Sequence, residues 1–336
     1  MDWDLPPTTS GKALVAKGRS GGPFNLYYEI HGTGSRRIVW IMGLGAYYTA
    51  WKRQTRHFGH QKGDQYSALV FDNRGMGRSD KPFCRYSTSE MAKDLIDLLV
   101  HVGWLDGEDA KGQGTQRKVH VVGVSMGGMI AQEMALLIPK SIASLCFVST
   151  APRIVRTVPF LENLKARALM FIPRDVDDEL NGVAHRLFAD EFLALPDTEA
   201  RELGFEEEGR TFPCNQDRVG AGELHKRQDK VGFTKKGFIY QAIAAGWHSK
   251  SKKDLKRLAE EVGRRRIEVF HGTADGMLVF QHGELLVKEL NDGVEQGEDK
   301  VEFRVWKGDG HVLPWEKRDE FNAAVEAVIG KGESLR

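Results

Sequence analysis

The sequence predicts an α/β fold in which helices cover both faces of a mostly parallel central sheet. Short runs of apolar and β-branched residues alternate along the chain with segments of helical periodicity. Several runs are apolar on both faces, which is typical of buried parallel strands. Their alternation with helical segments indicates strand–helix–strand units. The 37 glycines follow no fixed period, as expected for a sheet with many tight turns.

The predicted elements follow one another in a regular order. Residues 26–30 alternate like a strand with one exposed face. A continuous apolar run at residues 38–42, and similar mostly apolar runs at 68–71, 119–124, 145–148, 267–270 and 301–306, predict further strands. Apolar stripes of helical period predict helices at residues 89–102, 126–138, 280–290 and 317–329.

The alternation of strands and helices breaks between residues 152 and 250. This stretch is rich in charge, shows no clear strand and holds two amphipathic segments, at 160–171 and 183–195. We therefore expect one core domain, formed by residues 13–151 and 251–336, with residues 152–250 inserted as a helical lid. Residues 1–12 are polar and contain two prolines, and we expect a loose tail there.

Composition excludes several classes of function. The 336 residues carry a formal net charge of +1, which gives no electrostatic reason to expect a nucleic acid or an anionic membrane as partner. Three distant cysteines (Cys84, Cys146 and Cys214) exclude a disulfide framework. The first residues lack the pattern of a signal peptide, and no apolar stretch is long enough to span a bilayer. We expect a soluble, cytoplasmic protein with a small-molecule substrate, and its oligomeric state stays open.

The strongest chemical signal is Gly123-Val124-Ser125-Met126-Gly127, which fits the pattern G-x-S-x-G of a nucleophile elbow. It follows the most apolar predicted strand and opens a predicted helix. A serine on such a sharp turn needs small residues two positions before and after it, and Gly123 and Gly127 meet that need. The Met126 N–H would lie at the helix N-terminus, where developing negative charge is stabilised.

A second donor to an oxyanion is expected from the loop after residues 38–42. Met42-Gly43-Leu44-Gly45 lies there, and its glycines would allow close approach to a substrate oxygen. The Leu44 N–H is the candidate donor.

A catalytic serine needs a base, and the base needs a carboxylate that orients it. Asp275 follows the predicted strand at 267–270, and His311 follows the strand at 301–306. Both would lie at the carboxyl edge of the sheet, together with Ser125. Asp309 is the alternative acid, but side chains two positions apart in a turn rarely pair well, so placement favours Asp275.

Three separated motifs carry a resemblance to the α/β-hydrolase superfamily, in the group of esterases, enol-lactonases and carbon–carbon bond hydrolases. They are Gly43-Leu44-Gly45, the segment FDNRGMGRS at 71–79, and Gly123-Val124-Ser125-Met126-Gly127. The resemblance covers residues 24–151 and 251–330. It implies the α/β-hydrolase fold and a structural role for Arg74. Two features depart from the family pattern: Met42 replaces a histidine that usually precedes the oxyanion loop, and the inserted segment matches no substrate-specific subfamily.

Together these residues predict a serine hydrolase that cleaves an ester, thioester or lactone through an acyl-enzyme. Ser125 would attack the carbonyl, His311 would move the proton, Asp275 would orient His311, and the Leu44 and Met126 N–H groups would stabilise the oxyanion. This chemistry implies no metal and no organic cofactor. Two alternatives stay open: carbon–carbon bond hydrolysis by the same triad, and a ligand-binding receptor on a hydrolase fold. For a hydrophobic substrate of small to medium size, the candidate binding residues of the inserted segment are Phe160, Phe192, Trp247 and His248.

Overall fold

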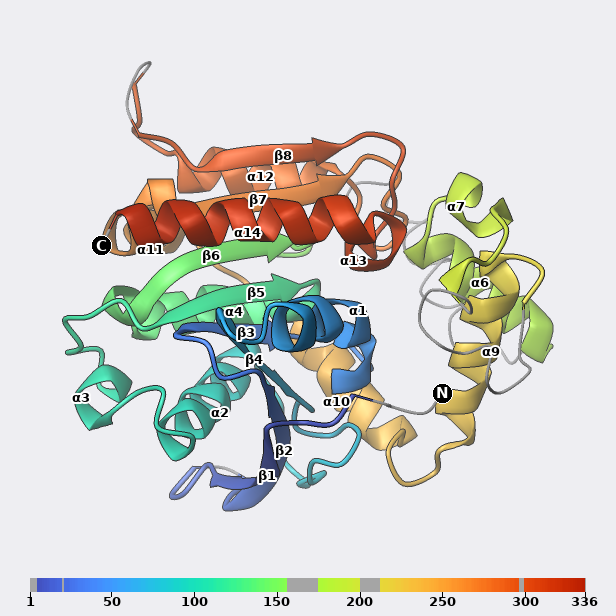
Figure 1. Ribbon diagram of the computed structural model, residues 1–336, viewed down its shortest axis with the longest axis horizontal. Coiled ribbons are helices and arrows are strands. Elements are labelled where there is room, and N and C mark those ends of the chain that lie inside the picture. Colours follow the sequence, from blue (N-terminus) through green and yellow to red (C-terminus); the bar gives the residue numbers. More distant parts are fainter. Residues whose placement is uncertain (1–4, 20, 156–174, 200–211, 296–298, 336) are drawn as a thin grey trace.

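The computed structural model describes residues 5–19, 21–155, 175–199, 212–295 and 299–335, and these residues form one eight-stranded sheet with helices around it (Figure 1). The strand order is β1-β2-β4-β3-β5-β6-β7-β8. The strands are β1 (Thr9–Val15), β2 (Phe24–His31), β3 (Arg36–Ile41), β4 (Tyr66–Phe71), β5 (Val119–Val124), β6 (Ile142–Val148), β7 (Ile267–Gly272) and β8 (Glu302–Trp306).

The sheet confirms the predicted fold class. From β4 to β8 in this order every neighbouring pair is parallel, whereas the pairs β1–β2 and β2–β4 are antiparallel. Every residue of β4, β5, β6 and β7 is buried, which explains why these strands read as continuous apolar runs. At the far edge, β8 is partly exposed.

The N-terminal tail is shorter than the sequence predicts. Thr9–Val15 form β1 and pair with β2 in register, from Thr9 opposite Ile30 to Val15 opposite Phe24. The strand escaped prediction because its first four residues are polar or glycine. Its exposed face points to solvent, and only Ala13 and Val15 are buried.

Helices pack on both faces of the sheet. One face carries α2 (Thr88–His101), α4 (Met126–Leu137), α11 (Lys252–Val262) and α12 (Gln281–Leu290), whose apolar side chains form one core cluster with alternate strand residues such as Val39 and Ile41. The other face carries η1 (Tyr48–Trp51), η2 (Thr55–Gln61) and α14 (Arg318–Ser334), which pack on the intervening residues such as Ile38 and Trp40. The remaining short elements are α1 (Lys52–Gln54), α3 (Gly107–Ala110), η3 (Pro139–Ser141), η5 (Arg264–Arg266) and α13 (Leu313–Glu316).

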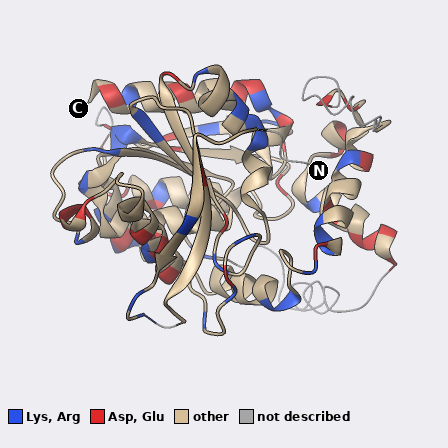
Figure 2. Ribbon diagram, turned by 60° about the horizontal axis from the view of Figure 1, so that its bottom comes forward, with Lys and Arg blue, Asp and Glu red and all other residues tan. Residues whose placement is uncertain are grey.

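Between β6 and β7, the described residues of the inserted segment form four helices: α6 (Val176–Leu187), α7 (Asp190–Ala194), α9 (Asn215–Gln228) and α10 (Lys235–Gly246). Figure 1 shows α6, α7 and α9 on the side toward which the parallel strands point. Positive and negative side chains are interspersed over the helices in Figure 2, in keeping with a net charge of +1. No helix among the described residues is both long and apolar enough to cross a bilayer.

Candidate active site

The loops that follow β5, β6 and β7 meet at one edge of the sheet. The Ser125 N–H, just after β5, donates to the Val148 carbonyl at the end of β6 (2.9 Å). In the same way, the Ser149 N–H donates to the Phe270 carbonyl in β7 (2.9 Å). Parallel strands bring their carboxyl ends together, and polar residues in these loops share one surface.

Ser125 lies on a strained turn between β5 and α4. Its φ of 57° and ψ of −122° are unfavourable for any residue with a side chain. The flanking glycines are required: a Cβ on Gly123 would lie 2.4 Å from the Gly127 carbonyl oxygen, and one on Gly127 would lie 2.1 Å from the Ile41 carbonyl oxygen. Close packing therefore allows the turn only with glycine at these two positions, as the motif predicts.

The loop after β3 passes directly over Ser125. A Cβ built on Gly43 would lie 3.1 Å from the Ser125 Cβ and 3.6 Å from its Oγ. Leu44 is next in the chain and packs partly buried against the core. Ser125 is itself partly exposed, so its side chain is accessible next to this loop. Leu44 and Met126 thus flank Ser125, one from each loop.

Side chains of the segment at 71–79 hold this loop. The Asn73 Nδ2 donates to the Met42 carbonyl (3.2 Å), and the Tyr48 N–H donates to the Asp72 Oδ1 (2.8 Å). Burial raises the pKa of Asp72 to about 6, although hydrogen bonds from the Arg78 and Tyr48 N–H groups act in the opposite direction. Met42, in place of the family histidine, packs against the other core cluster.

His311 and Asp275 form a buried pair. The His311 Nδ1 lies 2.7 Å from the Asp275 Oδ2, and only 3% and 4% of these two residues is exposed. The second oxygen, Asp275 Oδ1, accepts the N–H groups of Met277 and Leu278, each at 2.8 Å. Burial alone would raise the pKa of Asp275, but the charge of His311 and the hydrogen bonds from His271 and His311 outweigh it and hold this pKa well below its ordinary value. The acid is therefore ionised throughout the neutral range.

Asp309, the alternative acid, is engaged elsewhere. Its carboxylate lies 3.6 Å from the Lys317 Nζ, and its backbone carbonyl accepts the Ala274 N–H (2.9 Å). Burial raises the pKa of Asp309. The geometry pairs His311 with Asp275, as the placement argument expects.

A third residue at this pair, His271, was not singled out from the sequence. It is fully buried at the end of β7, with its Nε2 2.7 Å from the Leu278 carbonyl oxygen and 3.2 Å from the Asp275 Oδ2. Because a carbonyl can only accept, the Nε2 carries the proton. The signal available in the sequence was its position four residues before Asp275, at the end of a buried strand.

Glu316 links the His311 loop to the inserted segment. Its carboxylate accepts the Gly310 N–H (3.0 and 3.1 Å) and the Ala189 N–H (3.2 Å). The His311 N–H also donates to Leu187, at the end of α6 (2.9 Å). Burial raises the pKa of Glu316 to about 7.

The raised pKa of Glu316 predicts that the free energy of unfolding depends on pH. The raised pKa means that the folded protein binds the Glu316 proton more tightly than the unfolded chain, so its contribution to stability is lost as the pH rises from about 4.5 to about 7. Glu316→Gln mimics the neutral form. Urea unfolding at pH 5 and pH 8 should show the variant gaining free energy of unfolding, relative to the parent protein, at the higher pH. The exposed Glu320→Gln serves as control. An equal gain at both pH values would contradict the expectation.

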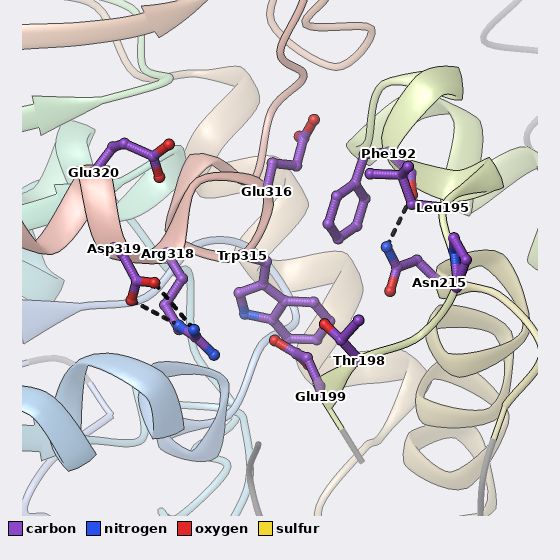
Figure 3. A pocket seen from close by; sticks show the side chains of 11 residues that line it. Phe192, Leu195, Thr198, Glu199, Asn215, Trp315, Glu316, Arg318, Asp319 and Glu320 are labelled. Atoms are coloured by element: carbon purple, nitrogen blue, oxygen red, sulfur yellow. Dashed lines mark hydrogen bonds and ion pairs between the residues drawn. The ribbon is translucent and has the colours of Figure 1, made fainter. Parts of the chain in front are cut away.

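Of the four expected substrate-binding residues, Phe192 lines a cavity among the described residues. It stacks on Phe188 (5.4 Å between ring centroids) beside a cavity of about 340 Å³ at α7 and α13 (Figure 3). Ser125 and His311 do not line this cavity. Its described lining also comprises Leu195, Pro196, Thr198, Glu199, Asn215, Trp315, Glu316, Arg318, Asp319 and Glu320.

The other three expected substrate-binding residues are not placed at this cavity by the described structure. Phe160 lies outside the described residues. Trp247 is 70% exposed, with the Arg85 guanidinium 4.8 Å from its ring centre, and this surface position is a poor place for a pocket wall. His248 is buried, with Nδ1 2.9 Å from the Thr88 Oγ1 and Nε2 3.3 Å from the Gln132 Oε1. Both ring nitrogens are occupied, so these contacts favour a packing role instead of the expected contact with substrate.

The fold and the site define an α/β hydrolase. Residues 36–316 match the family described as the alpha/beta hydrolase fold, and the chain belongs to this family. Within the described residues, no group of three or more His, Cys, Asp or Glu side chains is placed to hold a metal ion.

The curated relatives carry several names, which include hydrolases, a lactonase and non-heme bromoperoxidases. The chain is 33% identical over 129 residues to RutD of Azorhizobium caulinodans, a protein named as a carbamate hydrolase, with 38% of this chain and 42% of RutD aligned. It is 28% identical over 130 residues to 3-oxoadipate enol-lactonase 2 of Acinetobacter baylyi, covering 38% and 43% of the two chains. The alignments thus span less than half the length of these curated relatives.

Solved structures extend the likeness in fold to nearly the whole chain. A thermophilic esterase from Thermogutta terrifontis superimposes with a TM-score of 0.65 at 19% identity, covering 97% of this chain and 99% of the esterase. At that identity the likeness shows the fold alone.

Proposed function

We propose that this protein is a serine hydrolase that cleaves a carboxylic ester, thioester or lactone through a Ser125–His311–Asp275 triad. The buried bond between His311 Nδ1 and Asp275 Oδ2, at the same sheet edge as the strained Ser125, carries the proposal. The bond leaves the His311 Nε2 as the only ring nitrogen available to take a proton from serine. A relative named as an enol-lactonase supports the same class of reaction.

The reaction proceeds in two halves. The Ser125 Oγ attacks the substrate carbonyl as its proton passes to the His311 Nε2. The Leu44 and Met126 N–H groups then stabilise the oxyanion, and the imidazolium returns the proton to the leaving alcohol or thiol. Water, activated by His311, releases the acid from the acyl-enzyme. The ionised Asp275 stabilises the imidazolium in both halves, and these steps require no metal and no organic cofactor.

A direct test uses a fluorophosphonate probe and p-nitrophenyl esters of increasing chain length. The proposal expects one labelled peptide, containing Ser125, and many turnovers per active site. Labelling at another residue would overturn the nucleophile. Labelling of Ser125 with only a few turnovers would favour a ligand-binding receptor. Selective cleavage of a carbon–carbon bond beside a ketone would favour a carbon–carbon bond hydrolase.

Asp275→Asn should lower kcat by about 10⁴-fold, because an amide neither stabilises the imidazolium nor selects the correct tautomer. Asp309→Asn is the matched control, since Asp309 lies in the neighbouring loop and pairs with Lys317. Steady-state hydrolysis of p-nitrophenyl acetate measures both variants. An equal loss in the two variants, or a greater loss at Asp309, would move the acid to the other loop.

We further propose that residues 152–250 act as a lid that selects the substrate, since α6 and Ala189 contact the His311 loop. Phe192→Ala should change KM across the ester series by a few-fold, because it removes one aromatic side chain from a cavity that Glu316, the residue that holds the His311 loop, also lines, while phosphonate labelling of Ser125 persists. The exposed Trp247→Ala serves as control. Loss of labelling with an unchanged chain-length profile would make the segment a structural support of the triad.

A further inference from the structure

We infer that Gln241, on α10 of the inserted segment, is a positioning residue that holds the oxyanion loop in its working geometry. The inference rests on the proposed function and extends it to a residue that contacts neither the substrate nor the triad. The side chain of Gln241 is fully buried. It links two loops of the core that are distant from it in sequence.

Both ends of the Gln241 amide are used. The Oε1 accepts the Gly45 N–H at 2.9 Å, and the Nε2 donates to the Arg74 carbonyl at 2.8 Å. These partners fix the orientation of the amide, because a backbone N–H can only donate and a carbonyl can only accept. A buried amide whose two bonds are both satisfied holds one geometry, and breaking either bond leaves a buried polar group unpaired.

Close packing brings α10 onto both loops. A Cβ on Gly237 would lie 2.1 Å from the Gly75 carbonyl oxygen, so the absence of a side chain lets the helix approach the loop at Arg74. At the other loop, a Cβ on Gly45 would lie 2.8 Å from the Phe238 ring. Gly45 has a φ of +69°, which also favours glycine. The two contacts fix the position of α10 relative to Gln241's partners.

Arg74 provides a rigid anchor for this arrangement. Its guanidinium is buried and makes two hydrogen bonds to Asp94, from Nε at 2.6 Å and from Nη2 at 2.7 Å. The rings of Phe24 and Tyr86 lie 4.8 and 5.4 Å from the guanidinium carbon. The Arg74 carbonyl that receives Gln241 therefore belongs to a fixed part of the core.

The two held groups lie on either side of the proposed oxyanion donor. Asn73 holds the Met42 carbonyl, in the peptide plane before Gly43, and Gln241 holds the Gly45 N–H, in the peptide plane after Leu44. The peptide plane between them carries the Leu44 N–H. Within the loop, this plane has one long backbone hydrogen bond, from the Ala46 N–H to the Gly43 carbonyl (3.5 Å), and glycine on both sides of Leu44 permits it several orientations. The two side-chain hydrogen bonds add to the constraint, and Gln241 supplies the part that comes from the inserted segment.

The test compares Gln241→Met with Gln132→Met. Gln132 is equally buried, donates to the Ala151 carbonyl (3.0 Å) and contacts His248 after the end of α10, and neither of these partners belongs to the oxyanion loop. Losing an oxyanion donor outright costs about 10²–10³ in kcat, so a misaimed donor should cost about 10-fold or more. We expect Q241M to show this loss in the kcat for p-nitrophenyl acetate, with KM nearly unchanged. Q132M should lower the melting temperature by a similar amount and leave kcat within about 2-fold.

Gln241→Glu provides the conservative rescue. Its carboxyl keeps an acceptor for the Gly45 N–H and, when protonated, a donor for the Arg74 carbonyl. Its kcat relative to the parent protein should exceed that of Q241M at low pH and decline as the pH rises. A kcat for Q241M equal to that of Q132M, or a loss confined to KM, would overturn the inference. Should Q241M fail to fold, Q241E and Q132E are compared in the same way across pH, and parallel profiles would overturn it.

The parent protein separates this inference from the function on which it rests. If the parent hydrolyses the ester and Ser125 is labelled, the proposed function stands, and the variants decide the role of Gln241 alone. If the parent neither hydrolyses the ester nor reacts with the phosphonate, the proposed function fails, and the inference falls with it before any variant is measured.

Discussion

Ser125→Ala should abolish ester hydrolysis and leave the fold intact. The side chain lies partly exposed on the turn between β5 and α4, so its removal creates no cavity in the core. Alanine has a Cβ of the same kind and bears the same backbone strain as serine. Removal of a triad member costs on the order of 10⁴ to 10⁶ in kcat, and the oxyanion donors alone would account for the remaining rate. Hydrolysis of p-nitrophenyl acetate and circular dichroism measure the two parts of this expectation.

Ser149 offers a matched control for that experiment. It also has a positive φ, of 45°, it follows the adjacent strand β6, and its buried hydroxyl has no hydrogen-bond partner among the described residues. Ser149→Ala should keep most of the activity, because nothing in its described surroundings orients it as a nucleophile. Activity above a few per cent in Ser125→Ala, with contamination excluded, would show that Ser125 is not the nucleophile. A comparable loss in Ser149→Ala would show that the assay reports strain at the strand ends and not chemistry.

The parts of the site that the sequence predicts are those set by local rules. The elbow at Ser125 requires two glycines at fixed spacing, and the structure gives each of them a backbone contact that leaves no space for a side chain. Asp275 comes after the buried strand β7 and His311 after the partly exposed edge strand β8, and the loops after parallel strands meet at one edge of the sheet. Locating the strand ends in the sequence is therefore enough to bring these residues together.

The parts that escaped prediction depend on contacts between distant segments. Gln241 lies 196 residues from Gly45 in the sequence, and no local pattern marks a glutamine whose partners are two backbone groups. Glu316 acts through Gly310 and Ala189, and the latter is 127 residues away. His248 was assigned to the pocket because the inserted segment supplies it, whereas the structure places its ring between Thr88 and Gln132. The position of His248 in the inserted segment did not identify the partners of its ring.

The glycines also divide into those that a local rule predicts and those that a contact between distant segments requires. The motif glycines beside Ser125 are predictable, because the turn itself requires them. Gly237 looks like any glycine in a helix, where it costs stability relative to alanine. Its value appears only when α10 is seen against Gly75, where a Cβ would meet the carbonyl oxygen at 2.1 Å. That approach is what brings Gln241 within reach of both loops.

His311→Ala should be as damaging as Ser125→Ala, because serine is a poor nucleophile until a base removes its proton. The buried Asp275 would then face a cavity, and its carboxylate would lose the partner that holds it at 2.7 Å. Activity of the parent protein should also fall on acidification below neutrality, since an imidazolium cannot accept the serine proton. Initial rates across pH 5–8 measure this effect, and a rate independent of pH would count against a histidine base.

The double variant Ser125→Ala/His311→Ala separates a triad from two independent contributions. Independent groups would multiply their losses, whereas members of one catalytic unit lose nearly everything with the first substitution. We therefore expect the double variant to be little worse than either single variant, with a residual rate set by binding and by the oxyanion loop. If the losses multiply, His311 assists the reaction by a route that does not pass through Ser125. In that case the buried bond to Asp275 would orient a base for water instead of for serine.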